Sequence, residues 1–348
     1  MEKIKFSICI PNYNYGHLID KTIQSVLNQS YKNFEIIVCD NASTDNSLEI
    51  IKSFSDKRIK LFENRMNVGF SANLDKVTQY ATGDYFILLS SDDLINDGAL
   101  NEYAKIIIES NGLVEPLIVM SGANVIDGNG NIIYTKKAKT GDIENYLNLN
   151  NQVNYTDSTK EKEFYYGHLL LKGLLLGTFQ PAGQFLTTCY SKSLYDNVEG
   201  YRSPLIIFPD AHFSHKLLFC NPKVVYINKF LFSYREHVSN NHAQQVKMNN
   251  IKGLTDNYLI TQLYSTAELN KIGILNNQIT KAFINNIIGL PAFIGFLRGK
   301  ITNSFRMLSF GYAAFPSLFW KNKYLYFVII LLPFFPFFKT YRFLKSKS

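Results

Sequence analysis

Residues 81–97, ATGDYFILLSSDDLIND, carry the pattern on which the fold prediction rests. The apolar run 85–89 follows a Gly-Asp pair, and its composition predicts a buried strand of a parallel sheet. The run ends in Asp92 and Asp93, at the position where open α/β sheets bind their ligands. Two adjacent carboxylates there can hold a hard divalent cation, whereas an isolated pair more often forms a turn that caps the next helix. The rest of the chain must distinguish these two interpretations.

Strands and helices alternate around this stretch. Short apolar runs predict strands at 6–10, 34–39, 59–62 and 117–126. Helical periodicity and capping residues predict helices at 18–29, 48–54, 71–80 and 98–109. This alternation predicts an α/β fold of Rossmann-like type, with a mostly parallel sheet flanked by helices.

The pattern changes after residue 130. Residues 135–163 are polar and rich in Asn and Lys, which predicts a long loop or an irregular insertion. The elements expected after it are a helix at 164–176, a strand at 185–190, a helix through Leu218 and a strand at 224–227. We therefore predict a catalytic domain at 1–240, with halves 1–130 and 131–240, and a helical region at 241–348.

Composition excludes several protein classes. The four cysteines (Cys9, Cys39, Cys189 and Cys220) are widely spaced, which indicates neither a zinc site nor a disulfide framework. No G-x-G-x-x-G follows the first strand, so a nicotinamide enzyme is disfavoured. The N-terminal apolar run is too short for a signal peptide, and we expect a cytosolic catalytic domain.

Positive charge is concentrated at the C-terminal end. The net charge is +8, and residues 271–348 contain eleven basic and no acidic residues, so the remainder carries 8 − 11 = −3. Apolar signals lie at 283–296, 305–320 and 324–338, and Pro333 and Pro336 interrupt the last run. This composition favours an interfacial or re-entrant anchor on an anionic membrane, with a soluble helical subdomain as the alternative. Nucleic acid is not expected, because the segment is too apolar.

Several motifs occur in the order and spacing of one enzyme family. They are SICIPNYN at 7–14, SVLNQSY at 25–31, FEIIVCDN at 34–41, STD at 43–45 and SDD at 91–93. Together they resemble glycosyltransferase family 2, and the similarity continues more weakly to about Asn241. The resemblance implies inverting enzymes of the GT-A fold that use nucleotide-diphosphate sugars.

The resemblance places the nucleotide sugar at the strand ends. Tyr13 can offer its ring to a nucleobase, and Asp40 can accept hydrogen bonds from the nucleoside. The family pattern places Asp92 near the ribose, and Pro11 and Asn67 belong to segments near the nucleotide. Asp45 is interpreted instead as a helix cap.

The same resemblance implies a metal ion, Mg²⁺ or Mn²⁺, with Asp93 as its ligand. The cation would neutralise charge on the departing nucleoside diphosphate. In the Y-R-x-H segment at 234–237, Arg235 and His237 are candidates for contact with the diphosphate or the metal, and a solvated loop is the alternative.

Inversion requires a base that takes the proton of the acceptor hydroxyl. The family places an acidic residue at the start of a helix after a Gly-aromatic segment. Here Gly200-Tyr201 leads to Asp210, which is therefore the candidate base, and a helix N-cap at this position is compatible with that role.

The resulting hypothesis is a metal-dependent glycosyltransferase on the cytoplasmic face of the plasma membrane, held there as a peripheral or monotopic protein. Its acceptor is expected to be a lipid-linked saccharide of a surface polysaccharide of the O-antigen or capsule type. A polymerising synthase is disfavoured, because several long spans would be needed. The alternative from another class is a catalytically silent nucleotide-sugar-binding or scaffold protein of the same assembly pathway.

Overall fold

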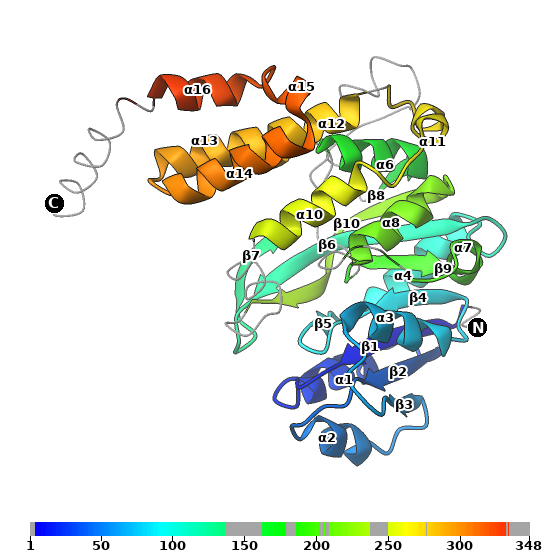
Figure 1. Ribbon diagram of the computed structural model, residues 1–348. Helices are drawn as coiled ribbons and strands as arrows, with labels where there is room; N and C mark the ends of the chain where they lie inside the picture. The colour runs from blue at the N-terminus through cyan, green and yellow to red at the C-terminus, as the bar shows by residue number, and fades with distance from the viewer. Residues whose placement is uncertain are drawn as a thin grey trace. The chain divides into compact units, whose positions relative to one another are not determined.

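Figure 1 shows the computed structural model, which describes residues 4–136, 162–178, 186–201, 203, 205, 209–236, 250–275, 277–331 and 333. The chain divides into two compact units. The first consists of Met1–Gly173 and Thr178–Asn249, and the second of Leu174–Gly177 and Asn250–Ser348. Each unit has a hydrophobic core of its own.

The first unit is built on one sheet with the strand order β3-β2-β1-β4-β9-β6-β10-β5, to which β7 and β8 add at β6 and β10. The strands are β1 (Phe6–Asn12), β2 (Phe34–Asp40), β3 (Ile59–Glu63), β4 (Tyr85–Leu88), β5 (Leu94–Ile95), β6 (Leu117–Ile126), β7 (Ile132–Lys136), β8 (Lys162–Tyr166), β9 (Thr188–Ser191) and β10 (Lys223–Arg235).

The first four strands along this order run parallel to one another. β9 lies antiparallel between β4 and β6, and β10 lies parallel to β6. The carboxyl ends of β1, β2, β4, β6 and β10 therefore lie at the same edge of the sheet. The predicted GT-A-type α/β fold is confirmed, and the antiparallel strands are confined to the second half of the sheet.

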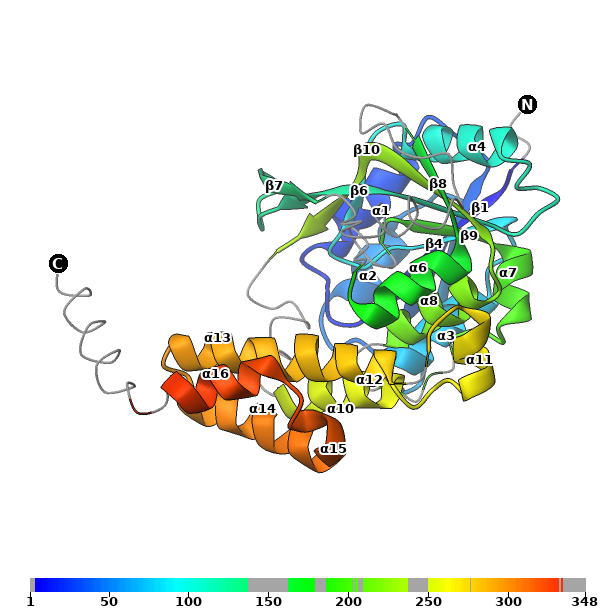
Figure 2. The same ribbon diagram turned by 90° about the horizontal axis from the view of Figure 1, so that it is seen from above.

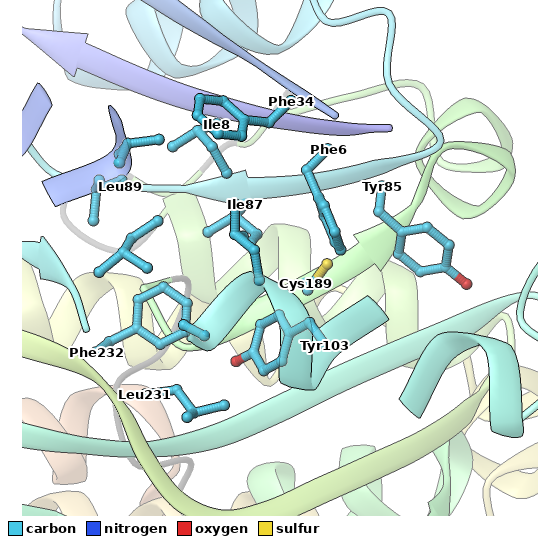
Figure 3. Close-up of a cluster of buried hydrophobic side chains, with 14 of the residues drawn as sticks. Phe6, Ile8, Phe34, Tyr85, Ile87, Leu89, Tyr103, Cys189, Leu231 and Phe232 are labelled. Atoms are coloured by element: carbon cyan, nitrogen blue, oxygen red, sulfur yellow. The ribbon is translucent and has the colours of Figure 1, made fainter. Parts of the chain in front are cut away.

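Helices cover both faces of this sheet (Figures 1 and 2). They are α1 (Ile19–Leu27), α2 (Ser47–Ser53), α3 (Phe70–Gln79), α4 (Ala99–Glu109), α7 (Lys192–Asn197), α8 (Pro209–Phe219) and α6 (Gly167–Leu176), most of which belongs to this unit. Side chains of α1 and α4 share a core with Phe6 and Ile87 (Figure 3). Phe86 points to the opposite face because side chains alternate along a strand, and there it packs on Tyr195 of α7.

Three sequence predictions in this unit need correction. The predicted loop at 135–163 has strands at both ends, β7 and β8, while 137–161 lie outside the described residues. The helix predicted at 164–176 begins only at Gly167, because β8 takes its first residues. The strand predicted at 224–227 continues to Arg235.

The second unit is helical. Its elements are α10 (Asn250–Ile260), α11 (Thr266–Lys271), α12 (Gln278–Ala282), the π-helix η1 (Phe283–Gly289), α13 (Leu290–Leu297), α14 (Ile301–Ala314), α15 (Pro316–Phe319) and α16 (Lys323–Leu331). α12, η1 and α13 form one apolar helix, Gln278–Leu297, whose 20 residues and mean hydropathy of 1.4 would permit it to cross a membrane. Of the predicted anchor at 324–338, residues 332 and 334–338 lie outside the described part.

Candidate active site

Asp92 and Asp93 lie in a tight turn directly after β4. The backbone N–H of Asp93 donates to the carbonyl oxygen of Ser90 over 3.2 Å, which closes the turn. The chain then enters β5, and α4 begins later, at Ala99, after an N-cap glycine without a side-chain cap. The interpretation of this acidic pair as a cap of the next helix is therefore wrong.

Arg235, at the carboxyl end of β10, holds this turn in place. Its backbone N–H donates to Oδ1 of Asp93 over 2.9 Å, and its Nε donates to the carbonyl oxygen of Asp92 over 2.8 Å. Nη1 donates to the carbonyl oxygens of Asp127 and Gly128, each over 3.0 Å. The side chain is buried, and these bonds give it a structural role, so its contact with a diphosphate stays a prediction.

The two carboxyl groups of the turn are themselves buried. Burial and, after it, the negative charge of Asp92 raise the pKa of Asp93, although the Arg235 N–H and Ser90 donate hydrogen bonds to it. Two like charges this close are costly in a water-poor site, and a cation bound beside them would reduce that cost.

Ser91 joins the acidic turn to the first strand. Its Oγ donates to the carbonyl oxygen of Pro11 over 2.8 Å, and its own carbonyl oxygen accepts from Oγ1 of Thr22 of α1 over 2.9 Å. Pro11 thus helps to position the turn, while its predicted contact with the nucleotide stays untested.

Asp40 ends β2 and is fully buried. Its Oδ1 accepts from Nδ2 of Asn12 over 2.7 Å and from Oγ of Ser43 over 2.6 Å, and its Oδ2 accepts from the Ser43 N–H over 2.9 Å. Within the described part of the chain, Oδ1 of Asn12 is buried without a hydrogen-bond partner, which a bound ligand can supply. Tyr13 follows directly and is 41% exposed, as a ring that stacks on a ligand should be.

Asn67 belongs to a hydrogen-bonded loop that begins beside Asp40. Oδ1 of Asn67 accepts from Nδ2 of Asn41 over 2.9 Å and from the Gly69 N–H over 2.8 Å. Oδ1 of Asn41 accepts from the Val68 N–H over 2.9 Å. Gly69 has a φ of +85°, where other residues are strained. These bonds fix the backbone between the nucleotide side of the sheet and the start of α3.

A cavity of about 510 Å³ lies at the start of α3. Phe70 and Ala72 line one side, and Tyr201 and Leu205 line the other. The backbone N–H of Tyr201 donates to Oδ1 of Asp75 over 3.0 Å, which joins the two sides. The structure thus brings the segment that follows Asn67 together with the Gly200-Tyr201 segment.

Asp210, in the first turn of α8, is linked to this cavity through Tyr201. The ring of Tyr201 stacks on Phe213 of the same helix at 3.8 Å between centroids, and burial and then the charge of Asp210 raise the pKa of Tyr201. Burial also raises the pKa of Asp210 itself, to about 6, against hydrogen bonds from its own N–H and that of Ala211. A carboxylate with a pKa near neutrality can exchange a proton at physiological pH.

Two candidate residues remain, His237 and Asp45. His237 lies outside the described residues. Asp45 lies one residue before Asn46, the N-cap of α2, and its Oδ1 accepts from the Ser47 N–H at the start of that helix over 3.0 Å. Sequence reasoning gave no role to Asn12, Ser91 or Phe70. The sequence signals that could have identified them are polar residues at or after the ends of strands, for Asn12 and Ser91, and an aromatic residue at the start of a helix, for Phe70.

The acidic turn suits a divalent cation that is shared with a substrate. Within the described residues, no group of three or more His, Cys, Asp or Glu side chains is arranged to hold a metal. Asp92 and Asp93 offer hard oxygen ligands, and Mg²⁺ is commonly held by one or two carboxylates together with substrate phosphates. The residues present therefore fit a cation that binds together with a diphosphate.

Residues 7–156 match the sequence profile of Glycosyl transferase family 2. One relative is the Escherichia coli UDP-Glc:alpha-D-GlcNAc-diphosphoundecaprenol beta-1,3-glucosyltransferase WfgD, 36% identical over 111 residues. That match covers 32% of this chain and 44% of the relative, so the chain spans less than half of its length. An uncharacterized glycosyltransferase of Methanocaldococcus jannaschii is 28% identical over 251 residues, which are 71% of this chain and 76% of that protein.

Among solved structures, the chain is similar to residues 1–349 of Staphylococcus aureus TarS in complex with UDP-GlcNAc. The TM-score is 0.61 at 18% sequence identity, and the match covers 88% of this chain and 79% of that one. This similarity supports the fold derived above from the strand order.

Proposed function

We propose that this chain, whose residues 7–156 match the profile of Glycosyl transferase family 2, transfers one sugar from a nucleotide-diphosphate sugar to a lipid-linked saccharide. The observation that carries the proposal is the meeting of Tyr13, Asp40 and the Asp92–Asp93 turn at one edge of the sheet. The lipid-linked acceptor and a UDP-sugar donor are suggested by the activity for which WfgD is named and by the ligand of TarS.

In this proposal the donor lies along the carboxyl edge of the sheet. The ring of Tyr13 stacks on the base, and Asp40 and Asp92 accept hydrogen bonds from the nucleoside. Asp93 would hold Mg²⁺ or Mn²⁺, which when bound supplies Lewis-acid stabilisation of the departing diphosphate. Arg235 keeps both carboxylates in position through the turn.

Asp210 is proposed as the base on the acceptor side. Its carboxylate takes the proton of the acceptor hydroxyl, whose oxygen forms a bond to the anomeric carbon while the bond from that carbon to the phosphate oxygen breaks. A single displacement of this kind inverts the anomeric configuration. The cavity between Phe70 and Tyr201 is the proposed acceptor site, because it presents aromatic rings and its lining residue Tyr201 interacts electrostatically with Asp210.

The proposed location of the enzyme is the cytoplasmic face of the plasma membrane. It would act there in a pathway that assembles a surface polysaccharide of the O-antigen or capsule type. A lipid-linked acceptor is confined to that surface, so a peripheral or monotopic enzyme meets it there.

The test is a donor panel, including UDP-Glc and UDP-GlcNAc, supplied with Mn²⁺ or Mg²⁺ and a lipid-linked acceptor extract. We expect sugar transfer by the purified chain and losses of at least about a hundredfold in Asp93→Ala and Asp210→Asn. The matched controls are the exposed residues Asp97→Ala and Asp196→Asn, which should retain full activity. Donor binding without transfer on any acceptor would instead favour the silent nucleotide-sugar-binding protein.

A further inference from the structure

The last described helix, α16, contains no charged residue apart from Lys323 at its start. Leu325 and Val328 are buried in the core of the second unit. The opposite face presents Tyr326, Phe327, Ile329 and Ile330, each between 47% and 61% exposed. At 100° per residue these four side chains and Lys323 occupy one continuous arc of the helix. A surface helix normally turns a polar face outward, so this arc is suited to an apolar environment.

The exposed apolar surface extends from α16 onto the preceding turn. Trp320 is 53% exposed, and its carbonyl oxygen accepts from the hydroxyl of Tyr326 over 2.6 Å. Tyr312 of α14 packs edge-on against Trp320, with 6.0 Å between ring centroids. Aromatic rings with polar tips are characteristic of the boundary between lipid and water.

The charged residues of the segment that contains this surface are all basic. Residues 271–331 contain seven basic side chains and no Asp or Glu. Lys321 and Lys323 flank the start of α16, and both are exposed. An apolar arc with two exposed lysines at its start complements an anionic bilayer rather than an uncharged protein groove.

The long apolar helix Gln278–Leu297 has a different environment. Phe283, Ile288 and Phe296 are buried in the same core as Leu325, and 39% of the helix is buried inside the structure. A bilayer-spanning position would require this helix to leave the packing that α14 and α16 provide. The packed face of this helix therefore belongs to the core of the second unit.

We infer that the outward arc of α16, with Trp320 and Tyr312, is a membrane-contact surface that lies in the interface of an anionic bilayer. It deepens the proposed membrane location and specifies which residues make the contact. Because vesicles contain neither donor nor acceptor, the inference can fail or succeed independently of sugar transfer.

The experiment measures binding of the purified full-length chain to phosphatidylcholine vesicles with and without phosphatidylglycerol. We expect binding that phosphatidylglycerol strengthens about tenfold or more. Phe327→Ser/Ile330→Ser and, separately, Lys321→Glu/Lys323→Glu should each weaken it by about tenfold or more. Circular dichroism melting checks that the variants are folded.

Matched controls come from the first unit. Ile132→Ser/Ile133→Ser removes two isoleucines of comparable exposure on β7, and Lys57→Glu/Lys105→Glu reverses two exposed lysines. Neither should change binding. The inference is overturned if folded α16 variants bind like the wild type, or if they change only the oligomeric state in size-exclusion chromatography. It is also overturned if the protein resists alkaline carbonate extraction from cells, as a spanning helix would.

Discussion

At the scale of single residues, Glu35 and Asp210 show how the environment shifts the pKa values of two buried carboxyl groups in opposite directions. Glu35 lies at the amino edge of the sheet, where Nζ of Lys60 donates to it over 2.8 Å and Oγ of Ser7 over 2.6 Å. Burial alone would raise the pKa of Glu35, but these bonds and those from Thr82 and Lys5 lower it from 4.5 to about 2. Among the described residues no cation lowers the pKa of Asp210, and burial raises it to about 6.

The lowered pKa of Glu35 predicts a pH-dependent stability. Its ionised form stabilises the fold fully above pH 4.5, and the contribution is lost as pH falls toward about 2. Glu35→Gln should lower the free energy of unfolding at neutral pH by about 2 kcal/mol, after allowance for the partial exposure of both lysines. Urea unfolding from neutral to acidic pH measures this. A variant with the stability and pH slope of the wild type contradicts the prediction.

The raised pKa of Asp210 predicts a pH-dependent rate. A base must be deprotonated, so kcat/KM should rise with pH up to about 6 and level off above it. A pH–rate profile for sugar transfer, with the unfolding transition followed over the same range, measures this. A rate that is already at its plateau near the ordinary pKa of aspartate would exclude Asp210 as the titrating base.

At the scale of elements, the sequence predicted the strand ends but not the long-range pairings. Tyr13, Asp40 and Asp93 each follow a readable apolar run, so their place at one sheet edge follows from the parallel order. β10 was predicted too short because Asn228-Lys229 interrupts its apolar run, where the structure shifts register between Ile227 and Phe230. β8 depends on antiparallel pairing with β10, which no local pattern reports. The role of Arg235 was missed for the same reason.

The contacts of Arg235 lead to a prediction about the Asp92–Asp93 turn that it holds in place. Arg235→Met removes three donated bonds and leaves the carbonyl oxygens of Asp92, Asp127 and Gly128 without these partners. An unsatisfied buried group costs about 1–3 kcal/mol, which applies to the carbonyl oxygen of Asp92, whereas water can replace the guanidinium at the partly exposed Asp127 and the exposed Gly128. We therefore expect a total destabilisation of about 1–3 kcal/mol together with slower transfer. Chemical denaturation measures the first, and Arg298→Met at an exposed arginine is the control. Unchanged stability would show that the guanidinium does not hold the turn.

At the scale of the whole molecule, charge and hydrophobicity are divided along the chain. Residues 271–348 carry eleven positive charges and the remainder a net charge of −3. An anionic bilayer therefore attracts the helical C-terminal part and weakly repels the rest. The composition of the sequence alone predicted this division. Which apolar segment contacts the membrane, the run at 324–338 or the helix Gln278–Leu297, could be inferred only from the structure, in which Phe283 and Ile288 are buried in the core.

This division predicts how salt affects membrane binding by the full-length chain. Raising NaCl from about 0.05 to about 0.5 M shortens the screening length severalfold, so association with phosphatidylglycerol-containing vesicles should weaken by about tenfold or more. Contact through the apolar arc of α16 does not depend on salt. Residual binding should therefore persist at high salt in the wild type and be lost in the Phe327→Ser/Ile330→Ser variant. Vesicle co-sedimentation across this series, with thermal melting in the same buffers, separates loss of attraction from loss of fold. Binding independent of salt would mean that apolar contact alone holds the protein and that the basic residues have another purpose.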